Sequence, residues 1–252
     1  MKNIWLIPLT LLLLHATLSS GAKPKHIVTI VVKGLGEVFL SNSTDLLPTI
    51  NEVLGEGSHT EELRSRNKAT EFPNLGCIIT GMSPESSGIR DDTWTPEDTD
   101  PDLTELKMPP ISGKGEIPPP LWHVMKQQDQ TLVIGIAVNS MFVPYFITSH
   151  LDFQNIPRFN NVFNDQELLQ NVILPHIKQD KPNFYFIVFA SLQNAADLFN
   201  YGSSQYYDAL LQIDTYIAQI IQALKEANIY NDTLLIITSD HGNSFFYLFS
   251  NN

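Results

Sequence analysis

LLIITSDHG, residues 234–242, joins an apolar run to a turn that carries a carboxylate, an imidazole and a glycine. The run Leu234–Ile237 has the length and composition of a buried strand. Asp240 and His241 follow it, and side chains of these two kinds can ligate a divalent metal. In open α/β sheets, functional groups gather where strands end. This stretch therefore indicates both a strand and a candidate site.

Strand-like and helix-like segments alternate through the rest of the chain. The clearest helix is residues 204–227, because Leu210, Ile213, Ile217 and Ile220 fall at three- and four-residue intervals and form one apolar stripe for the core. Repeated strand–helix–strand units predict an α/β fold, a mostly parallel sheet with helices on both faces. The other strands are expected at His26–Val32, Leu132–Val138 and Phe184–Phe189, and the other helices at Asp45–Leu54, Asn74–Ile79, Leu121–Gln127 and Asp165–Lys178.

The first 22 residues have the features of a signal peptide. Lys2 precedes an apolar run, Ile4–Leu14, and small residues follow near Gly21. The run is short for a membrane anchor, so a cleaved signal and a secreted, extracellular chain are expected. Asn42 and Asn231 begin Asn-x-Ser/Thr tripeptides, which are acceptors for N-glycosylation in secreted proteins.

Residues 23–252 are expected to form one domain. It contains an acidic, proline-rich surface loop at about 90–120, where six carboxylates lie between Asp91 and Asp102. The formal net charge of −12 excludes nucleic acid as a partner, because no basic surface is available to meet phosphates. No stretch after the first 22 residues predicts integral membrane contact. Cations, a phosphate-containing ligand or the extracellular matrix stay open as partners.

Two further segments resemble a known family. They are Glu71-Phe72-Pro73-Asn74 and Thr80–Ile89, which are similar to the nucleophile region of the nucleotide pyrophosphatase/phosphodiesterase family of the alkaline phosphatase superfamily. The similarity continues, in family order, through Asn183-Phe184-Tyr185 to Ser239-Asp240-His241-Gly242. It implies an alkaline-phosphatase-like fold, in which two zinc ions activate a Thr or Ser nucleophile against a phosphate ester.

The positions that would carry this chemistry are mostly changed. Lys33 stands where the resemblance implies a metal-ligating Asp, and Glu71 stands where it implies the nucleophilic Thr. Asp92 matches an Asn that steadies the transferred group. Only two metal-ligand positions keep their residue type, Asp240 and His241, whereas Gln193 and Asp197 replace a further Asp and His. The chain also ends soon after Gly242, so a C-terminally incomplete domain with an uncovered sheet edge is expected.

The leading hypothesis is a secreted, phosphodiesterase-like pseudoenzyme with a binding or matrix role. No residue is assigned a catalytic role, and whether the chain is an enzyme stays open. Lys33 is expected to replace the missing metal charge by pairing with Asp240 or Glu71 across the strand ends. No cofactor is then expected.

Two alternatives stay open. The first is a weakened or altered metal-dependent hydrolase of phosphate or sulfate esters, using zinc. In a variant of it, a set of acidic side chains and one imidazole converge on calcium, which prefers oxygen ligands; the set is Glu71, Asp92, Asp197, Asp240 and His241. The second alternative is an acidic extracellular-matrix protein. The feature that suggests it is the group of carboxylates between Asp91 and Asp102.

Overall fold

A computed structural model describes residues 23–41, 46–60, 70–92, 119–140, 153–155 and 164–242. Within these residues the core is a five-stranded sheet in the order β3-β2-β4-β1-β5, and every pairing is parallel. The strands are β1 (His26–Val32), β2 (Ile134–Val138), β3 (Phe153–Asn155), β4 (Phe184–Phe189) and β5 (Thr233–Thr238). The predicted α/β fold with a mostly parallel sheet is confirmed.

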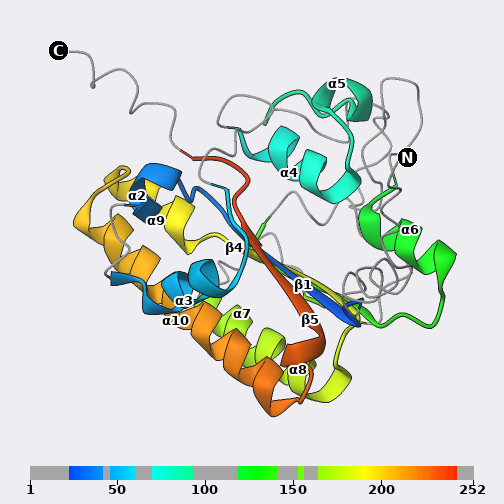
Figure 1. The fold of residues 1–252 in the computed structure, drawn as a ribbon. Helices are drawn as coiled ribbons and strands as arrows, with labels where there is room; N and C mark the ends of the chain where they lie inside the picture. Colours follow the sequence, from blue (N-terminus) through cyan, green and yellow to red (C-terminus); the bar gives the residue numbers. More distant parts are fainter. Residues whose placement is uncertain are drawn as a thin grey trace, which may run out of the picture.

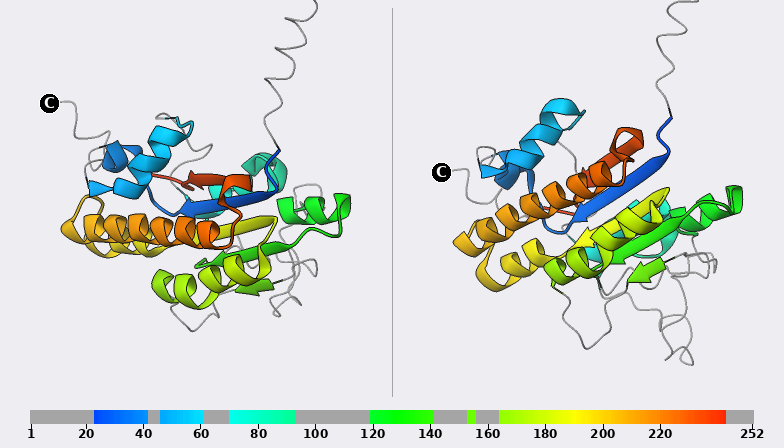
Figure 2. Two further views of the ribbon diagram at one scale, coloured as in Figure 1. Left: turned by 60° about the horizontal axis from the view of Figure 1, so that its bottom comes forward. Right: turned by 90° about the horizontal axis from the view of Figure 1, so that it is seen from below.

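Helices cover both faces of this sheet (Figure 1). One layer contains the 23-residue helix α10 (Ser204–Glu226) together with α3, α7, α8 and α9, and the other contains α4 and α6. Figure 2 shows α10 running along one face of the sheet. The remaining bounds are α2 (Glu37–Ser41), α3 (Pro48–Glu56), α4 (Glu71–Thr80), α5 (Pro84–Ser87), α6 (Leu121–Gln128), α7 (Asp165–Leu168), a π-helical segment (Leu169–Ile173), α8 (Leu174–Asp180), α9 (Ser191–Phe199) and a 3-10 turn (Tyr230–Asp232).

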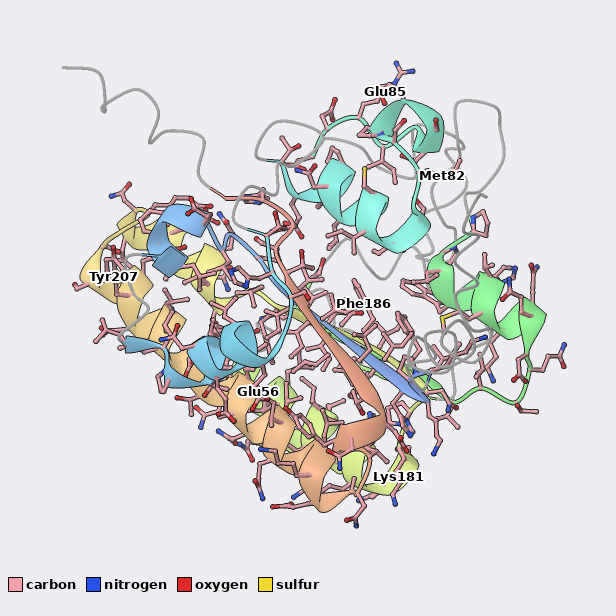
Figure 3. The ribbon with its side chains drawn as sticks, viewed as in Figure 1. Glu56, Met82, Glu85, Lys181, Phe186 and Tyr207 are labelled. Atoms are coloured by element: carbon pink, nitrogen blue, oxygen red, sulfur yellow. The ribbon has the colours of Figure 1, made fainter. Side chains whose placement is uncertain are left out.

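The central strands are apolar throughout because they are buried on both faces. In β1, Val28, Ile30 and Val32 pack in the core that also contains the apolar stripe of α10. Val31 points to the opposite face, where its cluster includes Leu75 of α4. Phe186 of β4 lies in this second cluster, in the interior of the molecule (Figure 3). Continuous apolar runs are the pattern expected of such doubly covered parallel strands.

The helix bounds differ from the sequence prediction at several points. The helix expected from Asp45 begins at Pro48 and continues through Gly55 to Glu56. Proline suits a first helical position, because it has no N–H to leave unbonded there. The helix expected over Asn74–Ile79 begins earlier, at Glu71, and ends one residue later, at Thr80, where the left-handed Gly81 follows. Three helices were not predicted: α2, α5 and α9.

Several sequence predictions fall outside the described residues. These are the signal peptide at 1–22, the acceptor Asn42, and most of the acidic loop, residues 93–118. None of the helices in the described ranges combines the length and the apolarity that crossing a membrane requires.

Candidate functional site

Polar side chains that directly follow three strands lie together at the carboxyl-terminal end of the sheet. Because the strands are parallel, their carboxyl ends lie on the same side. Lys33 follows β1, Ser140 lies two residues after β2, and Asp240 lies two residues after β5. The first residue of helix α4, Glu71, lies at this carboxyl-terminal end as well.

The centre of the site is an ion pair between Lys33 and Glu71. Lys33 Nζ lies 2.8 Å from Glu71 Oε1, and the two side chains are only 9% and 22% exposed. Ser140 Oγ donates to the same carboxylate oxygen at 3.3 Å, and Ser140 is buried. Of the two partners predicted for Lys33, the structure therefore selects Glu71. The ammonium and the carboxylate neutralise one another in a largely water-excluded position.

The start of α4 is fixed by Asp92. Thr70 is the extended residue before the helix, and Glu71 is its first helical residue. Asp92 Oδ1 accepts a 2.7 Å hydrogen bond from the backbone N–H of Phe72, so its carboxylate satisfies a donor that the helix start leaves unpaired. Asn74 Nδ2 donates to the carbonyl of Thr70 at 2.8 Å. Asp92 is thus a helix-capping residue.

Asp240 connects the end of β5 to the end of β1. Its Oδ1 atom accepts from the backbone N–H groups of Gly34, at 3.1 Å, and His241, at 2.8 Å. Its Oδ2 atom is buried and has no hydrogen-bond partner among the described residues. His241 Nε2 lies 3.6 Å from this atom, which is beyond hydrogen-bond distance. Asp240 and His241 keep the residue types that the resemblance implies, but their side chains are not hydrogen-bonded to each other. The role that the structure shows for Asp240 is to link the ends of β1 and β5.

Gln193 and Asp197 lie on α9 and bond to each other. Gln193 Nε2 donates to Asp197 Oδ1 at 2.6 Å, and the hydroxyl of Tyr201 donates to Gln193 Oε1 at 2.7 Å. Gly34 has a φ of +75°, and any side chain there would collide with Gln193. Burial raises the pKa of Tyr201 to about 12, and the nearby carboxylates of Asp197 and Asp240 act in the same direction. Gln193 therefore packs closely over the end of β1.

These residues do not fit a metal centre. In the described part of the chain, no three or more His, Cys, Asp or Glu side chains are grouped so that they could hold a metal ion. Glu71 faces Lys33, Asp92 caps α4, and Asp197 bonds Gln193. The predicted convergence of Glu71, Asp92, Asp197, Asp240 and His241 on a cation is therefore wrong. An ammonium at position 33 also repels a cation at the place where the resemblance implies a ligand.

Two further residues position the site, and sequence reasoning missed both roles. Asp165 is 2% exposed; its carboxylate accepts from the backbone N–H groups of Ala190 and Ser191 and from the side-chain amide of Asn139. It thereby fixes the turn from β4 into α9, which carries Gln193. Ser140 completes the ion pair. The only signal for Ser140 was its place just after a predicted strand, and no local pattern pointed to the role of Asp165.

Comparison with known proteins places this arrangement in context. A sequence model described as "Type I phosphodiesterase / nucleotide pyrophosphatase" matches residues 27–246. The chain is 27% identical over 223 residues to human ectonucleotide pyrophosphatase/phosphodiesterase family member 1, a match covering 83% of this chain and 22% of the human protein. It is 24% identical over 236 residues to venom phosphodiesterase of Macrovipera lebetinus, covering 88% of this chain and 26% of the venom protein.

A solved structure supports the fold. The chain superposes on an inactive variant of murine ectonucleotide pyrophosphatase/phosphodiesterase 5 in complex with AMP, with a TM-score of 0.64 and 19% identity. The match covers 86% of this chain and 57% of the murine chain. This chain spans about a quarter of the length of the curated relatives that it matches, from 22% to 27%.

Proposed function

Because the chain belongs to the type I phosphodiesterase / nucleotide pyrophosphatase family, we propose that it is a secreted member that has lost the hydrolytic reaction. The observation that carries this proposal is the 2.8 Å ion pair between Lys33 and Glu71. The pair occupies the two positions where the resemblance implies a metal ligand and the nucleophile.

The residues of this pair do not supply the groups that phosphate-ester hydrolysis in this family would need. Glu71 offers a carboxylate, already paired with Lys33, where a hydroxyl would attack. The ammonium of Lys33 is already bonded to Glu71, so it is not available to stabilise charge that develops on phosphate oxygens. Loss of one such stabilising group typically costs about 3 kcal/mol in the transition state, and several groups are changed here.

The scaffold around the site is held together by buried carboxylates even though the residues expected for the reaction are changed. Asp240 joins the ends of β1 and β5, and Asp165 fixes the start of α9. An intact scaffold that lacks the reacting groups favours a role in binding outside the cell, to a phosphate-containing ligand, a cation or extracellular matrix. The acidic-matrix alternative stays a prediction, because residues 93–118 lie outside the described ranges.

Hydrolysis of a nitrophenyl phosphodiester tests the proposal. The secreted chain is assayed with added zinc, beside a venom phosphodiesterase as a positive control and a heat-denatured sample as a blank. We expect nitrophenol release equal to that of the blank. Turnover that depends on zinc would contradict the proposal and support the weakened-hydrolase alternative. Glu71→Thr, which places the family hydroxyl at position 71, should stay inactive while Lys33 is present.

A further inference from the structure

The carboxylate of Glu71 is held in the way that proteins hold a bound anion. Lys33 Nζ lies 2.8 Å from its Oε1 atom, and Ser140 Oγ donates to the same atom at 3.3 Å. Both donor residues are buried, with exposures of 7% and 4%. An ammonium and a hydroxyl that converge on one oxygen form charge-assisted and neutral hydrogen bonds of the kind that bind carboxylate and phosphate groups. Lys33 and Ser140 therefore form an oxyanion site, and its occupant is a side chain of the same chain.

The sheet positions both donors without help from α4. Lys33 directly follows β1, and its backbone N–H donates to the carbonyl of Phe189 at 3.0 Å. Ser140 follows Asn139, whose backbone N–H donates to the carbonyl of Val188 at 3.0 Å. Both strand ends are thus bonded to β4, the central strand of the sheet. We therefore expect the two donors to keep their places when the carboxylate is removed.

The carboxylate itself comes from a different element. Glu71 is the first residue of α4, which packs on the sheet through Leu75 and Ile79. Its side chain is 22% exposed, against 9% for that of Lys33, so an ion from solvent can reach the position that the carboxylate occupies. Replacing Glu71 with alanine removes one methylene and the carboxylate. Together these have nearly the size and the charge of an acetate ion, so the variant offers acetate a matching space.

We propose that Glu71 is a built-in anion that closes the oxyanion site of Lys33 and Ser140 to carboxylate- and phosphate-bearing ligands. Because the carboxylate belongs to the same chain, its local concentration at the two donors exceeds that of a free anion. The contact is thus autoinhibitory: a phosphate-containing ligand binds the wild type away from these two donors. The inference rests on the proposed function, because it treats the ion pair as the centre of a binding site that performs no reaction.

The test is rescue of Glu71→Ala by small anions. Urea unfolding of the full chain is measured in sodium acetate, formate and phosphate, each against sodium chloride at equal ionic strength. The variant should be less stable than the wild type in chloride and should regain stability in the other three salts. Above the Kd of the anion, each tenfold rise in its concentration should raise the ratio of folded to unfolded chain by about tenfold. The wild type, measured in the same salts, gives the general effect of each salt on stability.

Three control variants assign the rescue to the two donors. Lys33→Met/Glu71→Ala lacks the ammonium and should respond to the anions no more than the wild type does. Ser140→Ala/Glu71→Ala lacks one hydrogen bond and should bind acetate about threefold to tenfold more weakly than Glu71→Ala does. Glu226→Ala breaks the exposed ion pair with Lys178, which also has a 2.8 Å separation. Solvent already screens that pair, so acetate should not stabilise this variant more than the wild type.

A second variant guards against misfolding. Glu71→Ser also empties the site and keeps a small polar residue at the start of α4, and it should show the same rescue. A variant that folds in acetate but not in chloride would support the inference as well.

Two results would overturn the inference: folded Glu71→Ala and Glu71→Ser that respond to anions no more than the wild type, or a wild type that responds as strongly as they do. Both results leave the proposed loss of hydrolysis intact. Zinc-dependent cleavage of a nitrophenyl phosphodiester by the wild type would contradict the proposed function, whereas the rescue of the variants would still report on the oxyanion site.

Discussion

Glu71→Gln removes one charge from the centre of the site and changes little else. The glutamine side chain has nearly the same shape, and its amide oxygen can still accept from Ser140 Oγ, which lies 3.3 Å from the carboxylate. The ammonium of Lys33 then loses its counter-charge at a position where only 9% of its side chain is exposed. We expect the variant to fold but to be clearly less stable than the wild type.

The size of the effect follows from the geometry of the pair. Two unit charges 2.8 Å apart attract by about 6 kcal/mol at an effective dielectric constant of about 20. Desolvation offsets much of that attraction. Removing one partner, however, leaves the other charge buried without a counter-charge, and for buried pairs this lowers the free energy of unfolding by about 3–5 kcal/mol. Glu71 is 22% exposed, so we take the lower end, about 3 kcal/mol. For a domain of this size, this loss lowers Tm by about 6–12 °C.

Thermal and urea unfolding measure this loss, and a second ion pair supplies the control. Lys178 and Glu226 are also 2.8 Å apart, but their side chains are 48% and 47% exposed. Glu226→Gln should leave Tm unchanged within error, because solvent screens exposed pairs. The double variant Lys33→Met/Glu71→Leu should recover most of the stability that Glu71→Gln loses. The reasoning is refuted if Glu71→Gln is as stable as the wild type, or if both glutamine variants lose the same stability.

Three further predictions concern other buried or partly buried polar residues. Asp214→Ala should cost about 1–2 kcal/mol in urea unfolding, because the buried Asp214 accepts from the backbone N–H of Ile50 and caps α3; an unchanged midpoint would contradict this. Asp165→Ala should cost about 3 kcal/mol and increase amide hydrogen exchange in α9, since it leaves two backbone donors unpaired; unaltered exchange there would count against it. Burial raises the pKa of Tyr201 to about 12 from 10.0, so its stabilising contribution is complete below pH 10 and is lost as the pH rises to about 12. Tyr201→Phe should therefore flatten the fall in stability between pH 10 and 12, and an unchanged slope would show that other groups cause it.

Much of the fold could be predicted from the sequence. The apolar runs at β1, β4 and β5 are long enough to identify strands, and the stripe of α10 identifies a helix over more than six turns. Strand order could not be predicted, because β1 pairs with β4 and β5, which lie far away in the sequence. No local capping pattern predicts helix α9, because the N–H of its first residue, Ser191, is satisfied by Asp165 from another element.

The site was predictable in part. The changed residue types at positions 33 and 71 were read from the sequence, but two partners for Lys33 stayed open until the structure placed Glu71 at 2.8 Å. The capping role of Asp92 depends on the path of the chain after α5, which local patterns do not specify. The predicted convergence of carboxylates on a cation was wrong for the same reason. Residue type indicates that a carboxylate can bind a cation, but tertiary packing decides which group it contacts.

The zinc content of the purified, secreted chain tests the central claim most directly. The chain is equilibrated with zinc, passed through a desalting column and measured by elemental analysis, with venom phosphodiesterase treated in parallel. If Lys33 and Glu71 have replaced the metal chemistry of the family, the chain should retain far less than one zinc per molecule. Retention of two zinc ions per molecule, together with zinc-dependent cleavage of a nitrophenyl phosphodiester, would contradict the claim.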